Sequence, residues 1–143
     1  MTVSLDPQTV QSFEDVRAHA LSNWSLRNND PYLLSFDVPT SGGRRQGVYL
    51  AEINTEDGAP MLRISSPVAP LGNIDAARCL RFNWEQRMGY LATNDLDGQA
   101  FLQLCENRQF RHLDGEELER LVHELGELAD RLEAMLVPGA DIT

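Results

Sequence analysis

The sequence predicts an α+β domain in which three helices cover one face of a five-stranded, mostly antiparallel sheet. Three segments repeat their apolar residues every three or four positions, as amphipathic helices do. Five shorter segments between them alternate or run apolar, as strands do. Turn residues order these segments as helix, three strands, helix, two strands, helix, so that hairpins join most of the strands. The 143 residues are read as one domain, with residues 1–6 and 138–143 as loosely held ends.

The first half of the chain is predicted to form one helix and three strands. Asp6 is an N-cap residue, and Pro7 suits the first turn of a helix. The apolar face of this helix is made by Val10, Phe13, Val16, Ala20, Leu21 and Trp24. Residues 28–31 read as a loop from their Asn, Asp and Pro content. Strands follow at residues 32–38, 46–54 and 61–65, with glycine-containing turns at 39–45 and 56–58.

A proline-containing segment, residues 66–72, separates the two halves and is expected to be neither helix nor central strand. Each of its two prolines lacks the N–H that either structure would use. Asn73 then caps a middle helix that carries Ile74, Ala77, Leu80 and Trp84, and Gly89 ends it. The next two strands, residues 90–93 and 100–105, form a hairpin whose loop contains Asp97-Gly98.

The last helix is the clearest element of the sequence. Asp114 and Glu117 form a start of the capping-box kind, and Pro138-Gly139 stops the helix. Its apolar stripe comprises Leu118, Leu121, Val122, Leu125, Leu128, Leu132, Met135 and Leu136. The other faces of this helix are acidic. We therefore expect the stripe to pack into the core.

The charge distribution excludes some classes of partner. A net charge of −10 argues against nucleic acid, because phosphate binding needs a basic surface. The acid is concentrated in residues 114–143, whereas residues 73–113 are neutral. No apolar run approaches the roughly 18 residues of a membrane span, and the N-terminus has no secretory signal. Cys79 and Cys105 indicate two buried thiols in a reducing compartment. We therefore expect a cytoplasmic protein that binds neither nucleic acid nor membrane.

No catalytic, cofactor-binding or metal-binding motif is visible, so the sequence predicts no enzyme and no cofactor. His123 lies among glutamates, which favours a surface ion pair over a metal site. The Gly42-Gly43-Arg44-Arg45 loop could hold a phosphate or a carboxylate, although a hairpin tip with two exposed arginines is the commoner structure. A small enzyme or ligand-binding domain that uses Arg44, Arg45 or His112 is the alternative from another functional class.

The strand at residues 46–54 is apolar on both of its faces. Tyr49, Ala51 and Ile53 alternate with Val48 and Leu50. Three helices on one side of the sheet would leave one of these sets uncovered, and an apolar surface that remains uncovered indicates an association site. We therefore predict that Tyr49, Ala51 and Ile53 bind a client protein.

Several segments of the second half resemble a known superfamily. Residues 78–84 (Arg-Cys-Leu-Arg-Phe-Asn-Trp) lead into residues 89–95 (Gly-Tyr-Leu-Ala-Thr-Asn-Asp), followed by the apolar strand 101–104. Residues 113–118 (Leu-Asp-Gly-Glu-Glu-Leu) then open the acidic helix. These segments and the element order resemble the type III secretion chaperone superfamily. That group includes effector chaperones of the CesT (Tir chaperone) kind and the YbjN-like proteins described as sensory transduction regulators. Residues 63–71 look more like the YbjN-like branch.

The resemblance implies a non-enzymatic homodimer that binds another protein, either as a chaperone for a secreted effector or other client, or as a YbjN-like regulator. It also implies pairing through the middle helix and the neighbouring strands. The neutral charge of residues 73–113 supports this independently, because two copies repel each other least there. Aromatic and arginine residues are enriched at interfaces. The predicted dimer interface comprises Arg78, Phe82, Trp84, Tyr90 and Phe101.

Overall fold

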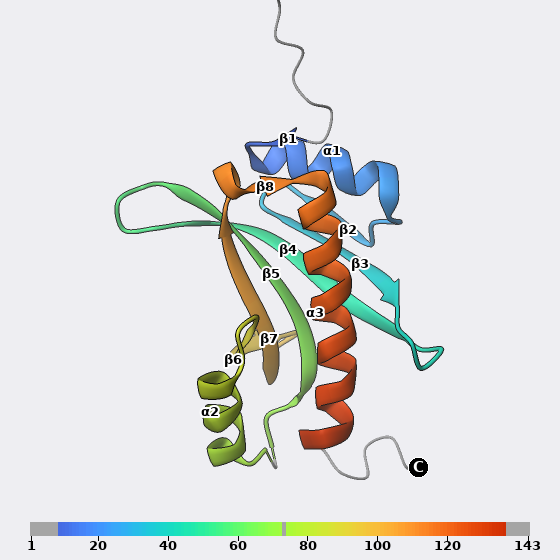
Figure 1. Ribbon diagram of the computed structural model, residues 1–143, viewed down its shortest axis with the longest axis vertical. Coiled ribbons are helices and arrows are strands. Elements are labelled where there is room, and N and C mark those ends of the chain that lie inside the picture. Colours follow the sequence, from blue (N-terminus) through green and yellow to red (C-terminus); the bar gives the residue numbers. More distant parts are fainter. Residues whose placement is uncertain (1–8, 73, 137–143) are drawn as a thin grey trace, which may run out of the picture.

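The computed structural model of the protein (Figure 1) describes residues 9–72 and 74–136, and over these residues the fold is α+β, with three α-helices and an antiparallel sheet. The helices are α1 (Phe13–Asn23), α2 (Ala76–Glu85) and α3 (Gly115–Leu136), and a short 3-10 helix, η1 (Phe110–His112), precedes α3. The large sheet contains β2 (Asn28–Asp30), β3 (Leu33–Pro39), β4 (Arg45–Asn54), β5 (Pro60–Pro70), β6 (Tyr90–Leu96) and β7 (Gln99–Gln109). A separate pair is formed by β1 (Thr9–Val10) and β8 (Leu113–Asp114).

The large sheet has six strands in the order β2-β3-β4-β5-β7-β6, one more than predicted. The extra strand, β2, occupies the segment predicted as a loop, and Asn28 pairs opposite Ser35 on β3. All three residues of β2 are exposed at the edge of the sheet, so their polar composition does not distinguish them from a loop. Every neighbouring pair is antiparallel, because β7 lies between β5 and β6 and the α2 crossover therefore creates no parallel pair.

β5 corrects a second prediction, because the segment expected to be neither helix nor central strand is its second half. β5 pairs with β4 only as far as Ser65, opposite Tyr49, while its pairing with β7 continues to Pro70. Pro67 thus lies where β5 has a neighbouring strand on one side, next to a register shift between Pro67 and Ala69. Sheets tolerate proline at such edges and bulges, since no ladder N–H is required there.

α3 crosses β4, β5 and β7 and supplies one wall of the core (Figure 1). Its predicted stripe is confirmed from Leu118 to Leu132: Leu118, Leu121, Val122, Leu125 and Leu132 are buried and Leu128 is half-buried. Met135 is exposed, and the side chain of Leu136 lies outside the described part of the structure. The buried strand residues beneath the helices include Leu34, Phe36, Val38, Val48, Leu50, Leu62, Ile64 and Leu104. Asp114 starts the helix as predicted, because its Oδ1 accepts a hydrogen bond from the Glu117 N–H at 2.7 Å. Pro138-Gly139 lies outside the described residues.

Gly126 sets the distance between α3 and the sheet. A Cβ added at this position would lie 2.8 Å from Cγ2 of Val38 and 3.6 Å from Cγ2 of Val48. Such a contact is far shorter than side chains tolerate, so a larger residue would push the helix away from β3 and β4. Close packing against β3 and β4 therefore explains why a glycine lies in the middle of this long helix.

α1 begins later than predicted. Ser12 is its N-cap, and the Ser12 Oγ accepts a hydrogen bond from the Asp15 N–H at 3.2 Å. Val10, predicted on the helix, belongs to β1 and pairs opposite Leu113. The predicted cap at Asp6-Pro7 lies outside the described residues. Of the predicted apolar face, Phe13, Val16 and Ala20 are buried, Trp24 stacks on Phe36 at 4.4 Å between ring centroids, and Leu21 is exposed.

α2 packs beside the β6–β7 hairpin. Asp75 is its N-cap, because the Asp75 Oδ1 accepts from the N–H groups of Ala77 and Arg78; the predicted cap, Asn73, lies outside the described residues. Cys79 is its buried residue. The Asn83 side chain accepts from the Leu91 N–H at 2.7 Å and donates to the Leu91 carbonyl at 3.2 Å, which joins α2 to the outer edge of β6. Within the described ranges, no helix combines the length and apolarity needed to cross a bilayer.

The β6–β7 connection confirms the predicted Asp-Gly turn. Asp97 and Gly98 have φ values of 53° and 81°, the positive values that a two-residue hairpin turn of type I′ requires. The two strands extend to Leu96 and from Gln99, so each is longer than the sequence predicted. The Asp97-Gly98 turn was therefore predicted correctly from its residues. The end of β6 was placed too early, because polar residues precede the turn.

Candidate functional site

The sheet has one face covered by the helices and a second on which the described part of the chain places no helix; we call the second the open face. Side chains directly opposite each other on antiparallel strands share a face. The register therefore places one row across all six strands of the open face: Asn28, Ser35, Tyr49, Ser65, Cys105 and Tyr90. The next row contains Leu33, Ala51, Arg63 and Asn107.

The predicted client-binding residues lie together on the open face. Tyr49, Ala51 and Ile53 occupy every second position of β4, and each is half-buried. Met61 on β5 pairs opposite Ile53 and extends this apolar strip toward the next strand. The strip is thus the uncovered side of β4, the strand whose sequence is apolar on both faces. Client binding by these residues stays a prediction.

A pocket lies on the open face beside this strip, over β5, β7 and β6. Its volume is about 290 Å³, and its lining residues are Arg63, Ser65, Tyr90, Ala92, Thr93, Asn94, Gln103 and Cys105. Gln103 and Cys105 are buried at its base. Burial raises the pKa of the Cys105 thiol, and the positive charge of Arg63 acts in the opposite direction. The thiol is therefore neutral at pH 7, and Arg63 is the charged group of this lining.

The five residues predicted to form the dimer interface lie on three different surfaces. Tyr90 and Phe101 are on the open face, since Tyr90 pairs opposite Cys105 and Phe101 is two strand repeats away from Cys105 on β7. Arg78 and Phe82 line a crevice toward α3, and Phe82 packs against the core. Trp84 is on the outer side of α2, where 89% of its surface is exposed. The structure therefore does not gather these residues into one patch.

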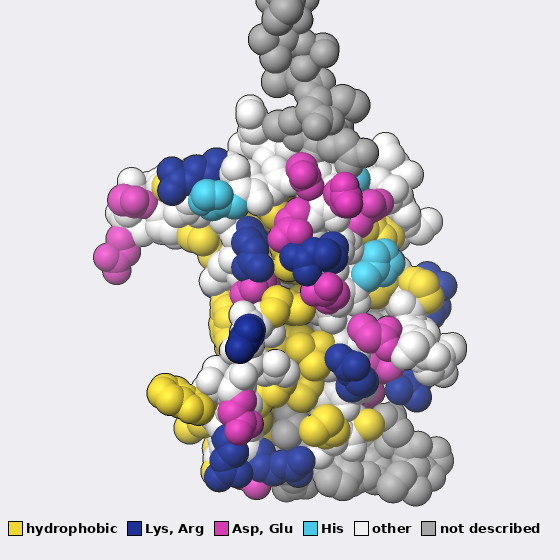
Figure 2. Space-filling model, viewed as in Figure 1, with side chains coloured by type: hydrophobic (Ala, Val, Ile, Leu, Met, Phe, Trp, Pro, Cys, Tyr) yellow, Lys and Arg dark blue, Asp and Glu magenta, His cyan; other side chains and the backbone are white. Residues whose placement is uncertain are grey.

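The outer side of α2 is apolar and exposed. Leu80, one helical turn before Trp84, is 68% exposed, so the two side chains share a face of the helix. Figure 2 shows hydrophobic side chains protruding at the outer side of α2. A groove of about 380 Å³ adjoins them. It is lined mainly by apolar residues of the segment before α2, of α2, β6 and β7, including Leu71, Ile74, Cys79, Leu80, Leu91 and Leu102.

The Gly42-Gly43-Arg44-Arg45 loop is tied to α3. Arg44 forms a bidentate ion pair with Asp130: its Nε lies 2.9 Å from Oδ1 and its Nη2 lies 2.8 Å from Oδ2. The Thr40 hydroxyl donates to the same carboxylate, and the Ser41 N–H donates to Glu127. Asp130 is only 3% exposed, and the Arg44 guanidinium holds its pKa below the usual range. Arg44 is therefore engaged by the fold, whereas Arg45 is exposed.

The residues of the alternative ligand site are not brought together. Arg44 contacts Asp130 in the second half of α3, whereas His112 lies in η1, ahead of the first turn of α3. These places are separated by roughly 20 Å or more along the helix, at 1.5 Å per residue. His112 accepts a hydrogen bond from its exposed neighbour Arg111. In the described ranges, 9–72 and 74–136, no three His, Cys, Asp or Glu side chains are grouped to hold a metal ion.

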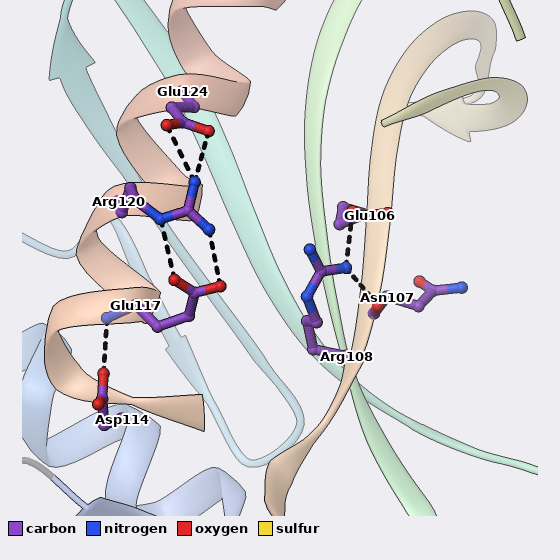
Figure 3. Close-up of polar contacts among 7 residues, drawn as sticks. All are labelled: Glu106, Asn107, Arg108, Asp114, Glu117, Arg120 and Glu124. Atoms are coloured by element: carbon purple, nitrogen blue, oxygen red, sulfur yellow. Dashed lines mark hydrogen bonds and ion pairs between the residues drawn. The ribbon is translucent and has the colours of Figure 1, made fainter. Parts of the chain in front are cut away.

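The covered side has its own polar cluster, which Figure 3 shows between α3 and β7. Arg120 is held between Glu117 and Glu124 on α3, with distances of 2.7 Å and 2.9 Å. Arg108 on β7 lies 2.6 Å from Glu106. The Arg120 guanidinium holds the pKa of Glu117 below its usual range. Each of these arginines already has a carboxylate partner, so this cluster fixes side chains and offers little to a ligand.

Sequence reasoning did not select Arg63 or Leu80 as functional residues. Arg63 stands alone among the apolar residues of its strand, with Leu62 and Ile64 on the opposite face, and that isolation was the available signal.

The chain matches no model of a known protein family, and no curated protein matches its sequence.

Proposed function

We propose that this protein is a cytoplasmic, non-enzymatic homodimer that binds an extended segment of a client protein, in the manner of the type III secretion chaperones it resembles. The observation that carries the proposal is the open face, on which no helix of residues 9–72 or 74–136 lies over the Tyr49–Ala51–Ile53 strip. A monomeric domain gains nothing by leaving such a strip half-exposed, whereas a client segment would bury it.

Dimerisation is proposed to use the outer side of α2. Leu80 and Trp84 project from one helical face beside the groove of about 380 Å³, and the same side chains of a second copy are proposed to enter that groove. A two-fold interface is self-complementary by construction, so a protrusion beside a groove suits it. Residues 73–113 are neutral in a chain of net charge −10, which reduces repulsion between the copies. Of the five residues predicted for the interface, Trp84 is the one that this proposal places at its centre.

Client binding is tested with insulin, whose reduction releases an aggregating B chain that serves as the model client. We expect the wild type to suppress light scattering at near-stoichiometric amounts. The double substitution Tyr49→Ser, Ile53→Ser should abolish suppression, because it removes the apolar strip. The matched control is Leu21→Ser, which removes an exposed leucine of α1 away from the open face. Equal activity of the double variant and the control would contradict the proposal.

Dimerisation is tested by sedimentation of the wild type and of Leu80→Ser at tens of micromolar, about the range in which weak pairs are detected. A dimeric wild type and a monomeric, folded Leu80→Ser variant are expected. Trp24→Phe leaves Trp84 as the one tryptophan, and its emission should shift to the blue as concentration rises. A wild type that stays monomeric would contradict the proposed homodimer. It would leave the client-binding proposal intact, because the insulin assay measures that property separately.

The alternatives are a YbjN-like regulatory or sensory protein and a small ligand-binding domain, and the second of these predicts a dissolved small ligand in place of a client. The pocket beside the strip is the observation that favours this second function. Failure of the insulin assay together with saturable binding of a small molecule would favour it.

A further inference from the structure

Arg63 differs from the other arginines of the molecule in its surroundings. All twelve arginines lie in described residues; nine are exposed, and Arg17, Arg63 and Arg108 are half-buried. Arg17 lies 3.1 Å from Glu14 and Arg108 lies 2.6 Å from Glu106, so each has a carboxylate partner. Arg63 has neither ion pair nor hydrogen bond within residues 9–72 and 74–136, and its Nε is fully buried. A buried N–H without an acceptor is costly and requires an explanation.

The pocket at Arg63 supplies hydrogen-bond donors and no negative charge. Hydroxyl groups come from Ser65, Tyr90 and Thr93, and Asn94 and Gln103 contribute side-chain amides. The described lining contains no Asp or Glu, in a protein whose net charge is −10. A single guanidinium surrounded by neutral donors is an arrangement that attracts and orients an anion.

We propose that this pocket binds a small organic monocarboxylate, anchored by the guanidinium of Arg63. The fork of an arginine matches the two oxygens of a carboxylate, and one positive charge balances one negative charge. A phosphate, with up to two charges at neutral pH, would remain partly unbalanced in this acidic protein. Ala92 and the ring of Tyr90 form an apolar wall for the body of the ligand. A volume of about 290 Å³, near the lower limit for ligand pockets, restricts that body to a small molecule.

The site is separate from the client-binding proposal, although both use the open face. Arg63 pairs directly opposite Ala51, so a ligand at Arg63 would lie beside the apolar strip. Carboxylate binding is measured on the protein alone, without any client. Loss of one property therefore leaves the other measurable.

Benzoate is the probe, and benzamide, which has nearly the same shape and no charge, is its control. The two are titrated separately into ¹⁵N-labelled protein at constant ionic strength, to about 20 mM, which saturates a site with a Kd near 1 mM. We expect benzoate to shift the Arg63 Nε–H signal and the backbone amides of Tyr90 and Cys105 in a saturable manner. Benzamide should bind at least tenfold more weakly. Shifts that do not saturate, or that centre elsewhere, overturn the proposal.

Arg63→Gln should lower the affinity for benzoate at least tenfold. The matched control is Arg27→Gln, which removes the same charge from the same face: Arg27 pairs with Asp37 at 3.2 Å and lies over Gly47, outside the pocket. The affinity of Arg27→Gln for benzoate should stay within twofold of that of the wild type. If Arg63→Gln does not fold, Asn94→Asp tests the same idea by placing a carboxylate among the pocket-lining side chains at an exposed position, and it should also weaken benzoate. Benzoate binding as tight as that of the wild type by a folded Arg63→Gln or Asn94→Asp variant overturns the proposal.

Inorganic phosphate is titrated in a third arm. Weaker binding of phosphate than of benzoate supports a carboxylate site. Tighter binding of phosphate overturns the choice of ligand class, and binding of both at the same strength shows a general anion site and overturns it as well.

Discussion

The two faces of the sheet are made by alternate residues of the same strands, yet they differ in almost every property. On the covered face, Leu50 and Ile64 pair directly opposite each other and are fully buried under the helices. One residue away, Tyr49 pairs opposite Ser65 on the open face, and both remain half-buried. The covered face also pairs its half-buried arginine, Arg108, with a carboxylate, whereas Arg63 on the open face has none in the described residues.

This difference separates stability from binding. Burial of apolar surface is the main favourable term in folding, and here it is concentrated between α3 and the covered face. Side chains on the open face contribute less to stability, so stability constrains them less and they can be suited to binding a ligand or partner. The comparison predicts that similar substitutions on the two faces have very different costs.

The largest expected effect is that of Leu125→Ala. Leu125 is fully buried between α3 and the sheet, and removing a buried leucine side chain costs about 2–5 kcal/mol through lost burial and the cavity left behind. Ile53→Ala, which removes a similar volume from the open face, should cost under about 1 kcal/mol. Urea denaturation measures both free energies of unfolding. Equal costs would contradict the distinction between the faces.

Arg44→Gln should have the next largest effect, because it leaves the buried carboxylate of Asp130 without its cation. Hydrogen bonds to charged groups are worth about 1.5–3 kcal/mol, and screening of the half-exposed arginine reduces the expected loss to about 1–2 kcal/mol. Arg45→Gln, the exposed neighbour, should change stability by no more than about 0.5 kcal/mol. Chemical denaturation at pH 7 distinguishes them.

The same ion pair predicts how the stability of the protein changes as the pH falls. The folded-state pKa of Asp130 is lowered by Arg44 and Thr40, so the unfolded chain binds a proton more readily than the folded protein does. The stabilisation is therefore complete above the ordinary aspartate pKa of 3.8 and is lost as the pH falls through the lower folded-state pKa. In Arg44→Gln the loss of stability between pH 5 and pH 2, about the range in which carboxylates titrate, should be shallower than in the wild type. A parallel decline in both proteins would count against the pair.

Gly126→Ala should destabilise the protein although alanine is the better helix former. The added Cβ would lie 2.8 Å from Cγ2 of Val38, and overpacking costs about 1–3 kcal/mol against a propensity gain of about 1 kcal/mol. A net loss of about 0.5–1.5 kcal/mol is expected from the difference of these two terms. In the background of Val38→Ala, which removes the contacting methyl, the same change should become neutral or stabilising. Stabilisation of the wild type by Gly126→Ala would show that α3 can move away from the sheet without cost.

The parts of this fold that follow a repeating pattern could be predicted from the sequence. The stripe of α3 has a helical period over more than five turns, and the Asp97-Gly98 turn has a defined backbone requirement, so both were found. β2 and the second half of β5 were missed, because an exposed edge strand carries loop-like residues, and because proline is excluded only where both neighbours need its N–H.

The candidate sites were harder to predict, since they depend on distant pairings. The open face follows from Tyr49, Ala51 and Ile53 alone, which the alternation within one strand reveals. The pocket at Arg63 requires the register of β5 with β7 and of β7 with β6, and no local pattern contains that register. Likewise, the partner of Arg44 is a residue 86 positions away.

The smallest expected effects sharpen the comparison most directly, because they use two half-buried arginines on adjacent strands. Arg108→Gln removes the ion pair with Glu106 on the covered side and should cost about 0.5–1.5 kcal/mol. Arg63→Gln removes a guanidinium whose Nε has no acceptor among the described residues, so stability should stay the same or rise slightly. Thermal unfolding of both variants without added ligand measures the contrast. A loss at Arg63 as large as that at Arg108 would mean that the fold itself satisfies Arg63, and the proposed carboxylate site would then lose the observation on which it rests.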